Sequence, residues 1–183
     1  GLATPLDGAR AFNAAVAAGQ PIAQRVSAFD TVSICFSKGL GAPVGSALCG
    51  SSAHIERARR VRKMLGGGMR QSGFLTAAAL YALDHHVERL ADDHRRAVAL
   101  AEGLRRHDYS VDDPETNLVY VTVPDATACQ DWLVEQGVLA FATAPDRMRL
   151  VTHLDVSEAD VAHARTVGVH GTPSLFLHGI RGD

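Results

Sequence analysis

The sequence predicts an α/β arrangement in the first half of the chain and a small α+β unit in the second half. The first half combines alanine-rich helical segments with short apolar strands rich in β-branched residues, as at 29–36. A long periodic segment follows over 74–107, and the alternating segment 117–123 is typical of a strand. The length of 183 residues suits one compact domain, with or without a small appendage.

Composition and charge disfavour several classes of function. With 46% hydrophobic and 21% charged residues the chain is typical of globular proteins, and its net charge of −2 gives no overall attraction to nucleic acid or to a membrane. No apolar run approaches the roughly 20 residues of a membrane helix, and no charged-then-apolar leader opens the chain. Cys35, Cys49 and Cys129 are odd in number and far apart, which fits a cytoplasmic protein without disulfides or a structural metal.

The first elements of the chain are separated by turn residues. A helix is predicted over 9–18, where alanine dominates and Gly19 stops the pattern. The buried strand 29–36 follows, and after a glycine-rich turn a second short strand is expected over 44–49.

Two helices are predicted after these strands. Ser51 or Ser52 can cap the first, which runs to about residue 65 and is ended by the glycines 66–68. The second covers 74–107, where apolar residues recur every three or four positions, and as one helix it would be about 50 Å long at 1.5 Å per residue. Because that length exceeds a small domain, we expect this helix to join two packed units.

The second half is predicted to alternate strands and helices. The strand 117–123 is followed by an amphipathic helix over 126–136 that Gly137 ends. Two further strands over 138–142 and 148–152 would form a hairpin, because Ala-Pro-Asp between them is typical of a turn.

The last segment begins with a helix signal and ends with a different pattern. Ser157 and Asp160 form a capping box for a final helix that Gly168 ends. The tail ARTVGVHGTPSLFLHGIRGD resembles the cis-proline segment of thioredoxin-like disulfide oxidoreductases, in which Pro173 would face a CxxC pair. The chain contains no CxxC, and an ordinary turn and strand is the alternative interpretation.

The stretch SICFSKGLGAPVGS carries the most informative chemistry. Lys38 follows a strand and is surrounded by serine and glycine. Desolvation among small residues would favour the neutral amine, which is the form that attacks a carbonyl group. A solvated lysine beside a turn is the alternative. Two phosphate-binding motifs do not match in spacing. In a dinucleotide-binding motif that begins with Gly39 and Gly41, the third glycine would stand at 44, but it stands at 45. A Walker A lysine would follow the glycines, whereas Lys38 precedes them.

Other charged residues also allow two interpretations, a functional one and a structural one. Asp7, at a strand end, and Arg10 can present opposite charges to one cavity, although Asp7 could equally be a helix cap. A solvated helix face explains the basic cluster Arg57, Arg59, Arg60, Arg62 and Lys63 better than nucleic-acid binding does. His85 and His86 are adjacent and cannot share a metal ion on a helix.

Four segments in order carry a family resemblance: LDGARAFNA, SICFSKGLGAPVGSALCGS, RKMLGGGMRQSGFLTAAALYALDHHVERLADDH and RLVTHLDVS. They resemble the low-specificity L-threonine aldolases, which are pyridoxal-phosphate (PLP) enzymes of the aspartate-aminotransferase-like fold, fold type I. The resemblance implies a remnant of the large PLP-binding domain over 1–73, and over 74–156 the long linking helix with a small α+β C-terminal domain. A divergent tail would cover 157–183.

The resemblance also implies roles for individual residues. Lys38 matches the lysine that binds PLP covalently, and Asp7 matches the aspartate that holds the pyridine nitrogen protonated. Arg10 matches an arginine near the cofactor and the substrate, and Arg149 matches the arginine that binds the substrate carboxylate. Arg70 matches a loop residue near the active site across a subunit contact.

The implied reaction is retro-aldol cleavage of threonine-type β-hydroxy-α-amino acids to glycine and an aldehyde, by a cytoplasmic homo-oligomer, dimer or tetramer. The family's segment before LDGAR, with its phosphate-binding turn and ring-stacking histidine, has no counterpart in this sequence. We therefore expect an incomplete chain with exposed sheet edges and little activity alone. The alternative is a non-catalytic, truncated or chimeric remnant that acts only as a packing or oligomerising module.

Overall fold

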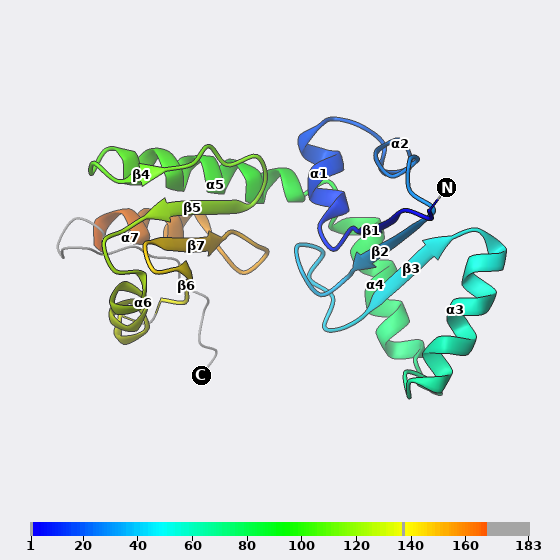
Figure 1. Cartoon of the computed structure of the whole chain (residues 1–183). Helices are drawn as coiled ribbons and strands as arrows, with labels where there is room; N and C mark the ends of the chain where they lie inside the picture. The colour runs from blue at the N-terminus through cyan, green and yellow to red at the C-terminus, as the bar shows by residue number, and fades with distance from the viewer. Residues whose placement is uncertain (1, 137, 168–183) are drawn as a thin grey trace. The chain divides into compact units, whose positions relative to one another are not determined.

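The computed structural model describes residues 2–136 and 138–167, and its chain divides into two compact units, Gly1–Leu90 and Ala91–Asp183 (Figure 1). Each unit has a sheet and a hydrophobic core of its own. The two are therefore described separately. The predicted domain limits 1–73, 74–156 and 157–183 stay predictions. Of the tail that resembles thioredoxin-like proteins, residues 164–167 belong to the last described helix, and Gly168 and Pro173 lie outside the described residues.

The first unit is built on a three-stranded mixed sheet. Its strands are β1 (Pro5–Asp7), β2 (Thr31–Cys35) and β3 (Ser46–Gly50), in the order β1-β2-β3. β1 is parallel to β2, with Asp7 opposite Ser33, and β3 is antiparallel to β2. The two predicted strands of this half are confirmed, each within two residues of its expected ends. Among the described residues, β1 and β3 each leave one edge without a neighbouring strand, as the outer strands of any open sheet do.

Helices α1 (Ala11–Ala17), α2 (Ile22–Arg25) and α3 (Ser52–Met64) complete the first part of this unit. The predicted helix 9–18 is confirmed as α1. Helix α3 confirms the capping prediction, because Ser51 Oγ accepts a hydrogen bond from the backbone N–H of His54 at 3.4 Å. Gly66 follows with a φ of 82°, a conformation that favours glycine and ends the helix.

The single long helix predicted over 74–107 is wrong. The structure has two helices, α4 (Gly73–His85) and α5 (Leu90–Arg105), separated by residues 86–89. The cause of the interruption is tertiary, since residues 86–89 contain neither glycine nor proline. His86 donates from its ring to the carbonyl of Leu40, and Leu90 is fully buried in a cluster with Leu40, Ala42 and Ala82. These contacts pull the chain away from one continuous helical path.

The first unit has a small core and a large apolar surface. Its buried cluster is Leu40, Ala42, Ala82 and Leu90, with Phe12, Val16, Phe36, Leu83 and Val87 packed against it. Several large apolar side chains on and around α3 and α4 are exposed, among them Leu65 at 82% and Phe74 at 92%. Monomeric proteins rarely expose so many together, so this surface is a candidate interface.

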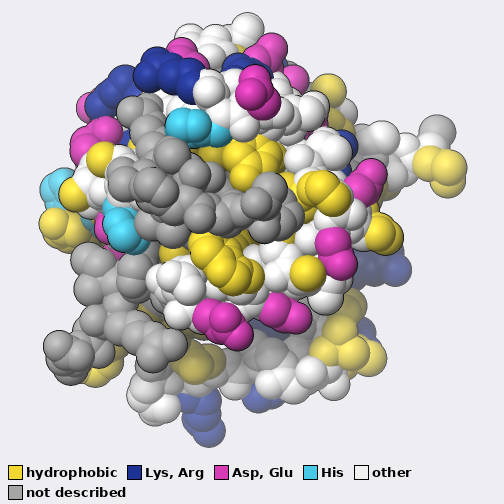
Figure 2. Space-filling model, turned by 90° about the vertical axis from the view of Figure 1, so that its left-hand side faces the viewer, with side chains coloured by type: hydrophobic (Ala, Val, Ile, Leu, Met, Phe, Trp, Pro, Cys, Tyr) yellow, Lys and Arg dark blue, Asp and Glu magenta, His cyan; other side chains and the backbone are white. Residues whose placement is uncertain are grey.

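The second unit is a four-stranded antiparallel sheet with helices. Its strands β4 (Ser110–Val111), β5 (Leu118–Thr122), β6 (Phe141–Ala144) and β7 (Arg147–Val151) lie in the order β4-β5-β7-β6. Helix α6 (Ala126–Glu135) and helix α7 (Glu158–Val167) contribute to one buried cluster, together with α5 and the inner strands. Figure 2 shows hydrophobic side chains lying among charged ones on one face of the molecule.

Predictions for the second half are mostly confirmed. The strand 117–123 and the helix 126–136 are present, and the capping box is formed, with Ser157 N–H donating to Asp160 Oδ2 at 2.7 Å and Asp160 N–H donating to Ser157 Oγ at 3.2 Å. The strand expected over 138–142 is instead Phe141–Ala144. Val138 is buried and its N–H donates to the carbonyl of Leu133 near the end of α6, so the chain is held at that helix before the strand begins.

Candidate functional site

Lys38 lies in the loop that joins β2 to β3. Three backbone hydrogen bonds fold this loop: Gly41 N–H to Lys38 O at 2.8 Å, Ala42 N–H to Phe36 O at 2.9 Å, and Phe36 N–H to Gly45 O at 2.9 Å. Gly41 has a φ of 70° and Gly45 a φ of 119°, which a residue with a side chain rarely adopts. The glycines of this segment therefore serve a tight turn that presents Lys38 at the end of β2.

The side chain of Lys38 is exposed. The described part of the chain therefore does not enclose this side chain among small residues as the sequence pattern predicts. Ser37 beside it is also exposed, and its hydroxyl lies 3.4 Å from Cys35 Sγ. The loop holds the lysine in place through its backbone and leaves the amine open to solvent.

Asp7 lies at the carboxyl end of β1, next to β2. Because β1 and β2 are parallel, the segments that follow them both leave the sheet at the carboxyl ends of these strands, so Asp7 and the Lys38 loop lie at one end of the sheet. Open α/β sheets bind ligands at this end, beyond the carboxyl ends of their strands. One carboxylate oxygen of Asp7 accepts a hydrogen bond from Ala9 N–H at 3.2 Å, which fixes the start of the turn into α1.

Arg10 stands at the N-cap position of α1 and is half-buried. It lines a cavity of about 380 Å³ together with Asp7, and Arg25 and Phe29 lie on the same cavity. The expectation that Asp7 and Arg10 face one cavity is therefore met. Lys38 is not among the described residues that line this cavity.

Arg70 follows α3 in the same unit, and its side chain is exposed. The glycines before it are closely approached by basic side chains, since a Cβ on Gly67 would lie 2.9 Å from Arg62 and one on Gly68 would lie 3.0 Å from Lys63. The loop therefore folds back against the end of α3. Its proposed role across a subunit contact stays a prediction.

Arg149 belongs to the second unit and lies on β7. Its guanidinium stands 5.4 Å from the centre of the Phe141 ring, which is its partner on the neighbouring strand β6. Its Nε is buried and has no hydrogen-bond partner among the described residues. A half-buried guanidinium with an unused N–H donor is suited to bind a carboxylate.

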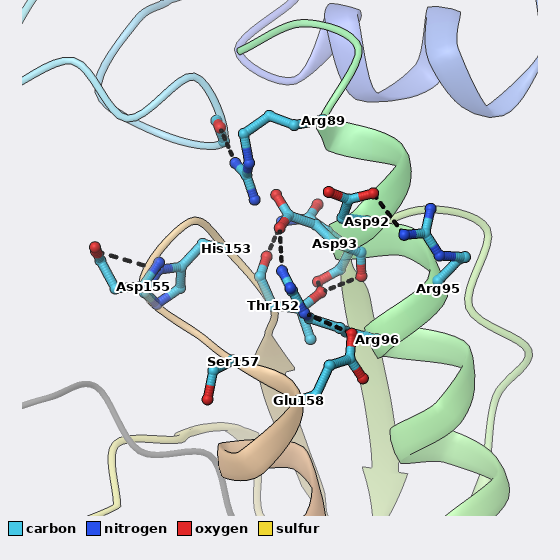
Figure 3. A network of polar contacts seen from close by, with 12 residues as sticks. Arg89, Asp92, Asp93, Arg95, Arg96, Thr152, His153, Asp155, Ser157 and Glu158 are labelled. Carbon is cyan, nitrogen blue, oxygen red and sulfur yellow. Dashed lines mark hydrogen bonds and ion pairs between the residues drawn. The ribbon is translucent and has the colours of Figure 1, made fainter.

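A buried polar network fixes the chain just after β7 (Figure 3). Thr152 donates from Oγ1 to the carbonyl of Asp93 at 2.7 Å, and Asn117 donates from Nδ2 to the carbonyl of Thr152 at 2.8 Å. Arg96 joins this network, with its Nε 3.0 Å from Glu158 and its Nη1 3.7 Å from Asp93. These bonds tie α5, α7 and the strand that carries Arg149 together.

Sequence reasoning missed these supporting residues. Asn117 and Thr152 are end residues of two predicted strands, but nothing in the pattern shows that they pair across 35 positions. Sequence reasoning considered His86 only as a metal ligand and did not single out Arg89, whereas both contact the Lys38 loop. The one available signal is the pair of adjacent histidines. Because neighbouring side chains on a helix point in different directions, one histidine of the pair can face the core while the other faces solvent.

Two findings bear on other kinds of site. Among the described residues, no group of three or more His, Cys, Asp or Glu side chains is arranged to hold a metal ion. None of the helices within 2–136 and 138–167 is long and apolar enough to cross a membrane.

Comparisons with known proteins identify relatives of this chain. The chain is 49% identical over 172 residues to a probable low-specificity L-threonine aldolase of Arabidopsis thaliana, covering 89% of this chain and 48% of the relative. It is 47% identical over 163 residues to the low specificity L-threonine aldolase of Escherichia coli O157:H7, covering 88% and 48%. The chain thus spans about half the length of these curated relatives.

The fold is shared with solved structures. A threonine aldolase structure from Leishmania major matches with a TM-score of 0.71 and 21% identity, over 91% of this chain and 51% of that one. This likeness confirms the predicted fold class, a mixed α/β fold of type I. A sequence model of the family described as beta-eliminating lyase matches residues 1–126, which include the strands and the loop that carry Asp7, Arg10 and Lys38. The chain therefore belongs to the beta-eliminating lyase family.

Proposed function

We propose that this chain is part of a PLP-dependent lyase that cleaves threonine-type β-hydroxy-α-amino acids to glycine and an aldehyde. The observation that carries the proposal is that Asp7 and the Lys38 loop lie at the same end of the sheet, because Asp7 ends β1 and the loop follows the parallel strand β2. The carboxylate would serve the pyridine nitrogen of PLP, and the primary amine at the same end of the sheet would serve its aldehyde.

The residues present fit the cofactor. Lys38 offers an exposed amine on a loop fixed by three backbone hydrogen bonds, so it can form the covalent bond to the cofactor aldehyde. Asp7 uses one carboxylate oxygen toward Ala9 and is exposed, so it can hold a proton on the ring nitrogen. When bound, PLP supplies a ring that takes up the electrons released as the Cα–Cβ bond breaks.

Two arginines would bind the substrate. Arg149 has a buried Nε without a partner among the described residues, and its guanidinium can make a bidentate pair with the amino acid's carboxylate. Arg10 shares a cavity with Asp7 and would contribute positive charge near the ring and the substrate. The phosphate-binding turn and the ring-stacking histidine have no assigned residues in this sequence, so we expect little activity from these 183 residues alone.

The partners follow from the same proposal. The ligand is a small amino acid, and neither nucleic acid nor a membrane is expected as a partner. We propose a cytoplasmic homo-oligomer, because α3, α4 and the Arg70 loop expose apolar side chains that a second subunit could cover.

The second candidate is a non-catalytic remnant that only packs or oligomerises. The exposure of Lys38 among the described residues favours it, since a working site would enclose the amine. The two candidates differ in what they predict for the amine, because only the first requires Lys38 to react with PLP.

The test uses the fact that the chain contains only two lysines, Lys38 and Lys63. The purified chain is incubated with PLP, reduced with borohydride and digested, and the modified lysine is identified by mass spectrometry. We expect selective labelling of Lys38, loss of that label in Lys38→Arg and no change in the matched control Lys63→Arg. Equal labelling of both lysines, or none, would refute the cofactor role and leave the remnant as the better interpretation.

A further inference from the structure

The junction between α4 and α5 makes a direct contact with the Lys38 loop. His86, the C-cap of α4, has its Nδ1 2.6 Å from the backbone oxygen of Leu40, two residues after Lys38. A carbonyl oxygen only accepts hydrogen bonds, so Nδ1 carries the proton and donates it. The bond joins residues 46 positions apart and is partly buried.

Two neighbours of His86 contact the same loop. Arg89 donates from Nη1 to the carbonyl of Gly39 at 3.5 Å, and Leu90 packs so close to Gly39 that a Cβ there would lie 2.8 Å from its Cδ2. Leu40 itself is buried in the cluster with Leu90. Three residues of one short segment thus contact the two residues that follow Lys38.

The histidine ring is held in place from its own helix. The Tyr81 ring meets the His86 ring edge-on, with the ring centres 5.5 Å apart. His85, the neighbour of His86, packs on the same tyrosine at 4.2 Å but is exposed, and among the described residues it makes no hydrogen bond to the loop. The helix therefore ends where His86 turns toward Leu40, which is also where the predicted long helix is interrupted.

We propose that His86 is a positioning residue that fixes the Lys38 loop through the carbonyl of Leu40. The role of Lys38 in this statement rests on the proposed function, whereas the hold on the loop does not. The Lys38 backbone is fixed on one side by β2 and on the other by the turn from Lys38 O to Gly41 N–H. His86 anchors the residue inside that turn, so the bond limits how far the base of the lysine side chain can move.

The first test measures the loop without any cofactor. In the full chain, the amides of Gly41 and Ala42 are followed by hydrogen exchange in His86→Leu, His86→Asn and the matched control His85→Leu. We expect roughly three- to tenfold faster exchange in His86→Leu, because one partly buried hydrogen bond is lost. The asparagine amide has an N–H the same number of bonds from the backbone as Nδ1, so it should restore slow exchange, and His85→Leu should match the unaltered chain.

The second test follows the lysine. The rate of PLP labelling at Lys38 after borohydride reduction is compared with the rate at Lys63 in the same samples. We expect His86→Leu to change the Lys38 rate alone and His86→Asn to restore it. Equal effects on both lysines would indicate general loss of structure and would overturn a positioning role.

The two tests separate the possible failures. If Lys38 is not labelled in the unaltered chain, the proposed function fails, and the exchange data still decide whether His86 holds the loop. If Gly41 and Ala42 exchange at the same rate in His86→Leu as in the unaltered chain, the inference is overturned, whatever the labelling shows.

Discussion

The junction between β1 and α1 allows a sharp test of how the Asp7 turn is packed. Gly8 lies against β2, where an added Cβ would be 2.8 Å from Val32 Cγ1 and 2.9 Å from the backbone oxygen of Ser33. Ordinary contact begins at 3.4 Å, so the backbone contact is about 0.5 Å too short. Val32 can rotate, but a backbone oxygen in the sheet cannot move without disturbing the β1–β2 pairing. We therefore expect Gly8→Ala to destabilise the first unit.

The size of the effect follows from overpacking, which costs about 1–3 kcal/mol for an added methyl in a tightly packed site. Gly73 is the matched control, because a Cβ there would meet nothing within 4 Å and it is the first residue of α4. Gly73→Ala should stabilise the unit by about 0.4–1 kcal/mol, since alanine reduces the entropy of the unfolded chain.

Hydrogen exchange of the β2 amides reports the stability of this unit alone. An overpacking cost of 1–3 kcal/mol corresponds to roughly 5- to 150-fold faster exchange where β2 opens with the unit, whereas Gly73→Ala should slow it. The reasoning is refuted if both glycine variants change the β2 exchange rates in the same direction and by similar amounts.

Three further predictions concern a helix cap and two titrations. Ser51→Ala should destabilise α3 by about 0.5–1 kcal/mol through loss of the bond to His54 N–H, read as faster exchange in the first turn. Burial lowers the pKa of His94 below its ordinary 6.5, with Asp93 acting in the opposite sense. The unfolded chain then binds the proton more readily, so the second unit should lose stability as the pH falls below 6.5 toward the folded-state value. Urea unfolding followed by the single tryptophan, Trp132, checks this, and a His94→Asn chain that keeps the same pH dependence would contradict it. Hydrogen bonds from Thr4 lower the pKa of Asp30 below 3.8, so their stabilising effect should be present above pH 3.8 and disappear as the pH falls through the folded-state value. NMR titration of Asp30 should show the pKa rising toward its ordinary value in Thr4→Val.

Local signals were predicted well because they act over a few residues. Ser51 and the Ser157–Asp160 box satisfy backbone groups three positions away, so their sequence spacing is enough to identify them. Gly19 ends α1 with a φ of 61°, which is also a local property. The break between α4 and α5 could not be found in this way, because its cause is a carbonyl at residue 40.

The candidate site was predicted in part. The positions of Lys38 and Asp7 at strand ends were expected. That both lie at the same end of the sheet depends on the parallel pairing of β1 with β2, which no local pattern encodes. The three-residue strand β1 and the two-residue strand β4 exist only through their partners. The exposure of Lys38 also depends on what surrounds the loop, which sequence alone does not give.

Within residues 2–136 and 138–167, β1 and β3 each keep one edge without a neighbouring strand, and this has a consequence for handling the purified chain. Each edge presents backbone donors and acceptors at strand spacing, and β3 adds the exposed Leu48 beside one of them. Such an edge can template the strand of another molecule. We therefore expect association that grows with protein concentration, and a lysine or proline introduced on the outer edge of β3 should keep the purified chain monodisperse for longer.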